Sequence, residues 1–201
     1  MVSSGECIGD PSPLGLLCFG ITTCLLMFEV TGWSESSFNI VVMAFAVCYG
    51  GIVQMVAGIF EFLKGNTFAG TAFLSYGAFW LSYFVTNFLE KTNPATFSGS
   101  FSVGKTLYLC LWGVLSFGLF IPTLRKNACL MVTFGTLTAT FFLLAGGVWN
   151  GHVHIAAGYL GFVCGCSALY TAFAILYQET LGIKVPGMQP VKVRQVTNEN
   201  P

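Results

Sequence analysis

Apolar residues occur in long runs along the chain, and short polar or charged connectors separate these runs. A membrane-spanning helix needs about 20 mostly apolar residues, within a range of about 17–25. The runs are continuous and do not alternate with a period of two, which favours helices over the strands of a barrel. The sequence therefore predicts an all-α membrane protein, a bundle of six transmembrane helices: Pro13–Val30, Phe38–Phe62, Phe68–Leu89, Thr106–Leu124, Ala128–Trp149 and Val153–Leu181.

Composition supports a protein that is surrounded by lipid. Of the 201 residues, 55% are hydrophobic and 8% are charged, whereas average soluble domains carry about 25% charged residues. Eight Lys and Arg with eight Asp and Glu are too few to cover a soluble domain of this size. A soluble enzyme and a disordered chain are thereby excluded. A nucleic-acid binder is also excluded, because the net charge of zero provides no basic field for a phosphate backbone.

The connectors leave no room for a second domain, since the longest one is Lys91–Gly104. We expect an N-terminal segment over residues 1–12, the transmembrane domain over residues 13–181, and a flexible tail over residues 182–201. With six spans, both ends lie on one side, and that side carries six of the eight Lys and Arg residues. The positive-inside rule then predicts that both termini are cytoplasmic, and we expect the plasma membrane as the location.

One face of the second predicted helix is polar. Gln54, Gly58 and Glu61 share that face, and Glu61 is the deepest acidic residue of the helix. Ionisable groups inside a membrane are costly, which favours a functional role such as a pore-facing or proton-accepting carboxylate. The alternative is an interfacial residue paired with Lys64 one turn later. The sequence leaves both interpretations open.

Stripes of polar and aromatic residues follow other predicted helices. Polar side chains in a span must face protein or water, so stripes on three helices suggest a shared polar interior. Alternatively, a threonine in a span often bonds only to the carbonyl four residues earlier, and the aromatic stripe is also typical of hydrogen bonds between helices or of an interfacial belt. The stripes are Phe19, Thr22 and Thr23; Tyr76, Trp80, Tyr83 and Asn87; and Thr133, Thr136, Leu137 and Thr140.

The connector between the second and third helices has the pattern of a helix end followed by a helix start. Gly65 is expected to end the second helix, and Asn66 or Thr67 to cap the third. The free N–H groups of that third helix would then point at the cytoplasmic end of the polar interior. Such a helix start favours an anion.

Many of the 24 glycines are spaced for close helix packing. Gly161 and Gly165 form a small-xxx-small pair, and Gly147 and Gly151 repeat this spacing. Small residues allow helix backbones to approach where lipid provides no hydrophobic drive. The pattern predicts a tight bundle or a tight oligomer.

Other chemistry has little support in the sequence. His152 and His154 fall in the predicted loop before the last helix, and two such ligands without a carboxylate make a weak metal site. No nucleophile–base set, phosphate loop or dinucleotide fingerprint is present. We therefore expect no enzyme activity, no cofactor and no bound metal.

The start of the first helix carries the most specific motif. It reads Asp10-Pro11-Ser12-Pro13-Leu14-Gly15-Leu16 and resembles the Asn-Pro-Ala-Pro-Leu-Gly-Leu signature of the acetate uptake transporter family, the succinate–acetate permeases. Asp10 stands where Asn is usual, and Ser12 where Ala is usual. The resemblance extends from Asp10 to Glu179 and includes Tyr49-Gly50-Gly51, Gln54, Gly58, Glu61, Gly65-Asn66-Thr67-Phe68 and Ser75-Tyr76-Gly77.

The resemblance implies a homo-hexamer of six-helix protomers in the lipid bilayer, each with its own path for acetate and, in several members, succinate. It also implies a hydrophobic constriction formed by Phe19, Tyr76 and Leu137, of which Leu137 depends on the alignment of Leu143-Leu144-Ala145. Members are described both as anion channels and as proton-coupled carriers. For this chain, both a channel and a carrier that uses Glu61 stay open.

A physical account of transport follows from the polar residues. Uncharged donors would replace part of the water around a carboxylate, and the narrow apolar ring would gate by excluding water. The candidate pore or substrate-binding residues are Thr22, Thr23, Gln54, Glu61, Asn66, Thr67, Thr133, Thr136 and Thr140. Asp10 can cap the first helix as Asn does, but it adds a negative charge near a mouth that admits anions. A path for a solute such as ammonia, and a membrane organiser that transports nothing, are the remaining alternatives.

Overall fold

The computed structural model describes residues 9–94 and 101–190, which are almost entirely helical. The helices are α1 (Ser12–Val30), α2 (Asn39–Val47), α3 (Gln54–Leu63), α4 (Thr67–Thr92), α5 (Phe101–Thr123), α6 (Ala128–Gly147) and α7 (Gly151–Leu181). A 3-10 turn, η1 (Ser36–Phe38), precedes α2, and a π-helical segment, η2 (Cys48–Val53), joins α2 to α3 without a break.

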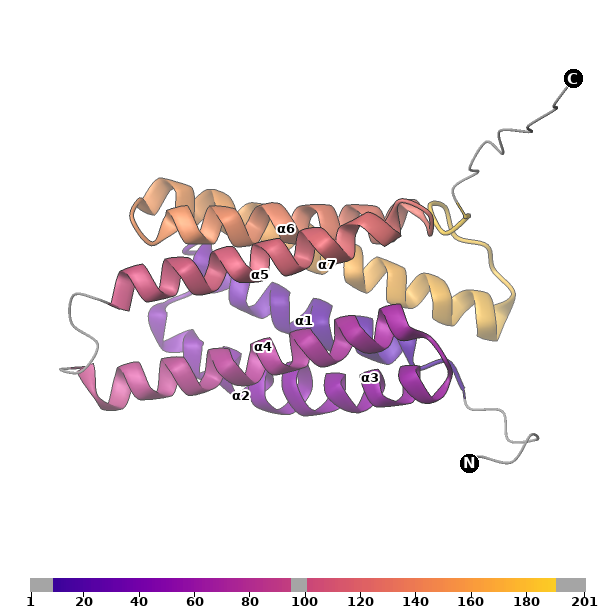
Figure 1. The fold of residues 1–201 in the computed structure, drawn as a ribbon, viewed down its shortest axis with the longest axis horizontal. Helices are drawn as coiled ribbons and strands as arrows, with labels where there is room; N and C mark the ends of the chain where they lie inside the picture. The colour runs from indigo at the N-terminus through magenta and orange to yellow at the C-terminus, as the bar shows by residue number, and fades with distance from the viewer. Residues whose placement is uncertain (1–8, 95–100, 191–201) are drawn as a thin grey trace, which may run out of the picture.

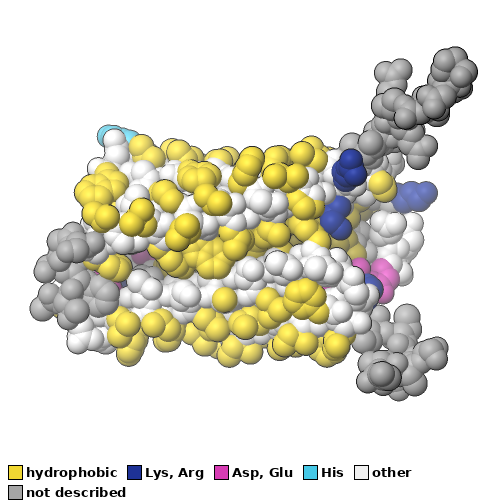
Figure 2. Space-filling view, viewed as in Figure 1, with side chains coloured by type: hydrophobic (Ala, Val, Ile, Leu, Met, Phe, Trp, Pro, Cys, Tyr) yellow, Lys and Arg dark blue, Asp and Glu magenta, His cyan; other side chains and the backbone are white. Residues whose placement is uncertain are grey.

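Six helical segments in the described part of the chain are long and apolar enough to cross a membrane, with η1 through α3 counting as one segment, Ser36–Leu63. The prediction of six spans is therefore confirmed. Large apolar side chains such as Ile40 and Leu111 are about 70% exposed on the outside of the bundle. Figure 2 shows apolar side chains along the visible flank, and Lys and Arg side chains gathered at one end.

Asparagine side chains set several helix starts. Asn66 Oδ1 accepts from the backbone N–H of Ala69 at 3.3 Å and begins α4, as predicted. Asn150 Oδ1 accepts from the N–H of His152 at 2.9 Å and begins α7 at Gly151. The prediction that His152 and His154 lie in a loop is therefore wrong, because this cap places both in the first turn of α7. Gly65, with a φ of +82°, ends α3 as expected.

The long helices run along the length of one bundle (Figure 1), and the contacts between them follow a ring around a common interior. Contacts run from α5 to α6, from α6 to α7, from α7 to α1, and from α1 to the paired α3 and α4. Tyr76 of α4 and Ser116 of α5 close the ring, with 2.9 Å between their hydroxyl oxygens. The interior is therefore enclosed by α1, α3, α4, α5, α6 and α7.

Glycines allow α7 to lie directly against α1. A Cβ atom at Gly161 would lie 2.3 Å from Met27 Sδ, and one at Gly165 would lie 2.6 Å from Cys24 Sγ. The small-xxx-small pair thus packs two helices of the same protomer. The predicted tight bundle is confirmed for this pair.

The contact between α7 and α1 leads to a stability prediction. We expect Gly165→Ala to lower the free energy of unfolding by about 1–3 kcal/mol, because the new methyl group would overlap Cys24. Gly118→Ala in α5 is the matched control, since nothing lies within 4 Å of its Cβ position. Thermal unfolding in detergent measures both variants. Equal midpoints would contradict the packing described here.

Residues beyond α7 return to the start of α6. The Tyr170 hydroxyl donates to the carbonyl of Pro186 at 3.0 Å, and the Cys129 N–H donates to that of Gly187 at 3.4 Å. Pro186 and Gly187 therefore lie against α6 and α7. The predicted flexibility of the tail stays a prediction, and residues 191–201 lie outside the described residues.

Candidate functional site

Aromatic side chains meet at the centre of the bundle. The ring centroids of Phe19 in α1 and Tyr76 in α4 are 5.4 Å apart, and those of Tyr76 and Phe134 in α6 are 6.2 Å apart. All three are buried, and Leu137 of α6 belongs to the same buried cluster. The structure thus brings two of the three predicted constriction residues into ring contact and buries Leu137 in the same apolar core, one turn after Phe134. Their role as a constriction stays a prediction.

Phe134 and Trp112 are parts of this cluster that the sequence analysis missed. The Trp112 ring lies 6.2 Å from Tyr76, and Phe134 also contacts Phe68 at the start of α4 with 5.4 Å between centroids. Phe134 precedes Leu137 by three residues, so helical spacing from Leu137 would have found it. A line of aromatic rings therefore extends from the centre of the bundle to the start of α4.

Gln54 is the most unusual polar residue of the interior. Its side chain is fully buried, yet neither Oε1 nor Nε2 has a hydrogen-bond partner in the described part of the chain. The same holds for Thr23 Oγ1 and Trp80 Nε1. Buried polar groups nearly always have partners, so each exception needs an explanation. Polar groups that could contact a passing solute would explain these three.

The π-helical segment brings some of these groups together. Gly50 lies one turn before Gln54, and a Cβ atom there would lie 2.9 Å from Thr22 Oγ1 and 2.9 Å from Trp80 Cδ1. Groups from α1, η2 and α4 thus converge at Gly50. Short π-helical segments occur frequently at functional sites. The amide of Gln54 and the indole N–H of Trp80 are uncharged donors, which suit a weakly bound anion.

Most of the candidate threonines bond within their own helix. Thr22, Thr133, Thr136 and Thr140 each donate to the carbonyl four residues earlier, at 2.7–3.0 Å. The alternative drawn from the sequence is confirmed for these four. Their hydroxyl protons are engaged, so the threonines are weaker candidates for anion donors than Thr23.

Glu61 and four neighbours make a connected group at one end of the bundle, which we call the corner cluster: Asp10, Ser12, Glu61, Lys64 and Asn66. Glu61 is fully buried, and its carboxylate accepts from Ser12 Oγ and from Asn66 Nδ2, the latter at 2.8 Å. Burying a carboxylate is tolerable only with such partners.

Lys64 does not pair with Glu61. Its Nζ lies 3.1 Å from Asp10 Oδ1, so the alternative of a Glu61–Lys64 pair is wrong. The backbone turns at Gly65, and Asp10 from the start of the chain reaches Lys64 instead. Sequence spacing along one helix carried no information on this partner.

Asp10 also contributes to the start of α1. Its Oδ1 accepts from the N–H of Ser12 at 3.1 Å, although Pro11 occupies the cap position itself. Partial burial acts to raise the pKa of Asp10, but the Ser12 N–H and Lys64 outweigh it, so this pKa lies below its usual range. Asp10 is therefore ionised at neutral pH.

The opposite end of the bundle is held by Asn39. Its Nδ2 donates to Glu29 Oε2 at 2.7 Å and to the Tyr83 hydroxyl at 2.8 Å, and its Oδ1 accepts from Lys91 Nζ at 2.8 Å. These bonds join α1, α2 and α4. The interpretation of Tyr83 as a residue that bonds helices together is confirmed.

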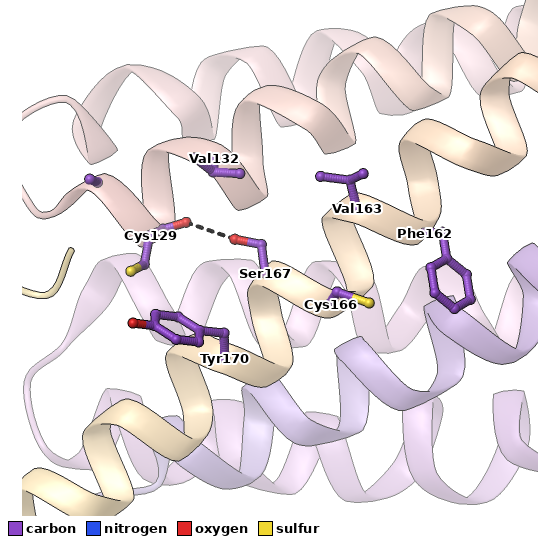
Figure 3. A pocket seen from close by; sticks show the side chains of 8 residues that line it. Cys129, Val132, Phe162, Val163, Cys166, Ser167 and Tyr170 are labelled. Atoms are coloured by element: carbon purple, nitrogen blue, oxygen red, sulfur yellow. Dashed lines mark hydrogen bonds between the residues drawn. The ribbon is translucent and has the colours of Figure 1, made fainter. Parts of the chain in front are cut away.

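Elsewhere, the described residues offer little for ligand chemistry. Residues 9–94 and 101–190 contain no group of three or more His, Cys, Asp or Glu side chains that could hold a metal ion. An apolar groove lies between α6 and α7 (Figure 3). Ser167 in this groove donates to the Cys129 carbonyl at 3.2 Å, so its hydroxyl is engaged. None of the predicted site residues lines the groove.

Comparisons with known proteins agree on one family. The sequence profile of the GPR1/FUN34/yaaH family matches residues 2–196. The succinate-acetate/proton symporter SatP of Escherichia coli K12 is 38% identical over 177 residues, covering 87% of this chain and 92% of that protein. Acetate permease A of Emericella nidulans is 32% identical and covers 82% of this chain and 60% of that protein. The solved structure of the bacterial acetate channel SatP matches with a TM-score of 0.84 and 37% identity, covering 91% of this chain and all of that one. The resemblance drawn from the sequence motifs is thus confirmed.

Proposed function

Because the protein belongs to the GPR1/FUN34/yaaH family, we propose that it conducts acetate and other short carboxylates, including succinate, across a membrane. It is an integral, multi-pass membrane protein, and the SatP symporter, acetate permease A and the SatP channel to which it is similar are named as acetate transporters or channels rather than enzymes. The observation that carries the proposal is the enclosed contact of Phe19 with Tyr76 at the centre of a helical ring, with Leu137 in the same cluster.

The constriction selects among carboxylates because it is narrow and because it excludes water. A bare charge cannot cross hydrocarbon, so the ion keeps partial solvation from uncharged donors on either side of the ring. Phe19, Tyr76 and Leu137 form a narrow apolar ring that gates by excluding water. Because no Lys or Arg lies in the interior of a predicted span, the ion is bound weakly and leaves rapidly. Size selection then comes from the ring.

The polar candidates divide between the two sides of the ring. One group consists of buried polar side chains: Gln54 of α3 and Thr23 of α1, together with Thr22, which lies beside Gly50. Asn66 and Thr67 stand at the start of α4, next to Glu61. The hydroxyls of Thr133, Thr136 and Thr140 remain available only as acceptors. We therefore assign Gln54 the main role in solvating the anion.

Assembly and orientation complete the proposal. The protein forms a homo-hexamer in the plasma membrane, in which each protomer keeps its own path and both termini are cytoplasmic. The motif resemblance to the acetate uptake transporter family supports the hexamer, and the excess of Lys and Arg on one side supports the orientation.

Uptake of radiolabelled acetate into proteoliposomes tests the function. We expect uptake driven by a membrane potential positive inside, without any pH gradient, because the permeating species is the anion. Protein-free liposomes are the control. Uptake that requires an acidic outer solution and ignores the potential would contradict conduction, and no uptake at all would contradict transport.

A proton-coupled carrier is the second candidate, and one observation favours it. Glu61 is a fully buried carboxylate between α1 and α4, and a relative is named a proton symporter. In that mechanism, Glu61→Gln abolishes acetate-driven proton movement. Under the proposed channel mechanism, this variant retains potential-driven acetate uptake. Internal pH and labelled acetate are recorded on the same preparation.

A further inference from the structure

The Asp10–Lys64 ion pair lies at the end of the bundle where α1 begins and α3 ends. Among residues 9–94 and 101–190, it is the only ion pair between a Lys or Arg side chain and a carboxylate, and its Nζ and Oδ1 atoms are 3.1 Å apart. The side chains of Lys64 and Asp10 are 40% and 28% exposed, so both contact solution. The signature that this chain resembles has Asn at the position of Asp10, and an asparagine cannot neutralise Lys64.

Asp10 is held in this position by the main chain. The Oδ1 atom that contacts Lys64 also accepts from the Ser12 N–H, and Ser12 Oγ donates to buried Glu61. The carboxylate therefore cannot turn away from Lys64 without breaking its bond to α1. Lys64 is consequently neutralised by a fixed partner rather than by a mobile one.

A second cation lies near the start of α4 at the same end of the bundle. Lys126 Nζ is 4.9 Å from the centroid of the Phe68 ring in the first turn of α4. Phe68 contacts Phe134, and Phe134 contacts Tyr76. Lys64 and Lys126 thus lie near the start of α4, where the line of aromatic rings begins. Figure 2 shows Lys and Arg side chains gathered at this end.

We propose that Asp10 lowers the rate at which carboxylates approach the path by neutralising Lys64, and that Lys64 attracts these anions when Asp10 is uncharged. This inference rests on the proposed transport of anions. A fixed charge near an opening raises or lowers the local concentration of a charged solute, and salt screens this effect. Asp10 is therefore a rate-setting residue of the opening, with a separate role in the start of α1.

Two substitutions separate the charge of Asp10 from its hydrogen bond. Asp10→Asn removes the charge and keeps an oxygen that accepts from Ser12, whereas Asp10→Ala removes both. Lys64→Gln removes the cation, and the double variant Asp10→Asn with Lys64→Gln leaves both positions neutral. Lys184→Gln is the matched control, because Lys184 lies just beyond α7 and outside the corner cluster.

Initial rates of labelled acetate flux in proteoliposomes are compared at ionic strengths of about 0.01 M and about 1 M, where the Debye lengths are about 30 Å and 3 Å. At low ionic strength we expect Asp10→Asn to raise the rate about two- to threefold and Lys64→Gln to lower it similarly. The double variant should match the wild type. At high ionic strength, all these differences should vanish. Lys184→Gln should change the rate less than Lys64→Gln does at low ionic strength and should have no effect at high ionic strength.

A structural role for Asp10 would give different results. A gain in Asp10→Asn that persists at high ionic strength, or that survives in the double variant, would overturn the inference, as would an unchanged rate in Asp10→Asn. Thermal unfolding in detergent checks that Asp10→Asn folds as the wild type does. If the wild type carries no acetate at either ionic strength, the proposed function itself fails, and this outcome differs from flux that ignores Asp10.

Discussion

Leu137→Ala is expected to raise the flux of propionate and lactate relative to acetate by about tenfold, since an extra methylene in an apolar constriction changes discrimination by at least that factor. The substitution removes most of a buried side chain that belongs to the same apolar core as Phe19, Tyr76 and Phe134. Liposome flux of the three acids, measured on one preparation, gives the order of selectivity.

Two further variants keep this prediction testable. Val132→Ala in the same helix is the control, because Val132 is 46% exposed on the outer surface and should leave the order unchanged. Leu137→Ala is expected to cost about 2–5 kcal/mol of stability, because it removes buried apolar volume. Leu137→Val is a milder substitution that should shift the selectivity in the same direction. An unchanged order in folded Leu137 variants would remove Leu137 from the constriction.

Gln54→Leu is expected to stabilise the protein while it lowers acetate flux by at least about tenfold. The amide is fully buried without a hydrogen-bond partner in the described residues, and an unpaired buried polar group costs about 1–3 kcal/mol. Leucine has a similar volume and no polar atoms, so it removes this cost. The same change deprives the anion of a donor on its path.

Gln54→Leu is informative because stability and acetate flux are expected to change in opposite directions. Stability and activity often trade against each other where a site keeps unpaired polar groups for a ligand. Gln178→Leu near the end of α7 is the control, because Gln178 is exposed. Thermal unfolding and acetate flux are measured on both variants. Full flux in a stabilised Gln54→Leu protein would show that the amide serves no anion.

The spans were predictable because each depends on a local property, the length of an apolar run. The observed helices differ from the predicted spans mainly at their ends, where hydrogen bonds set the boundaries. For example, α7 starts at Gly151 rather than at Val153 because Asn150 caps it. The π-helical segment Cys48–Val53 was not predicted. One extra residue in a helical turn leaves no mark in an apolar pattern.

The candidate site was predictable only as far as helical faces and motifs reach. Phe19 and Tyr76 lie in matched motifs, and they meet in the structure. The partner of Lys64 is 54 positions earlier in the chain, and the burial of Gln54 without a hydrogen-bond partner appears only in the folded bundle. Such facts depend on tertiary packing, which spacing within one helix does not describe.

The central claim is that carboxylates cross through an interior path that passes Leu137. Leu137→Cys tests it, in a protein whose exposed thiols Cys48 and Cys166 are replaced by serine, with Val132→Cys as the control on the outer face of α6. A small anionic methanethiosulfonate reagent is applied, labelling is read by mass spectrometry, and acetate flux is measured before and after. The account predicts that the reagent labels position 137 and blocks most of the flux, while labelling at position 132 leaves flux intact. A thiol at position 137 that stays unlabelled, or that is labelled without loss of flux, would contradict the account.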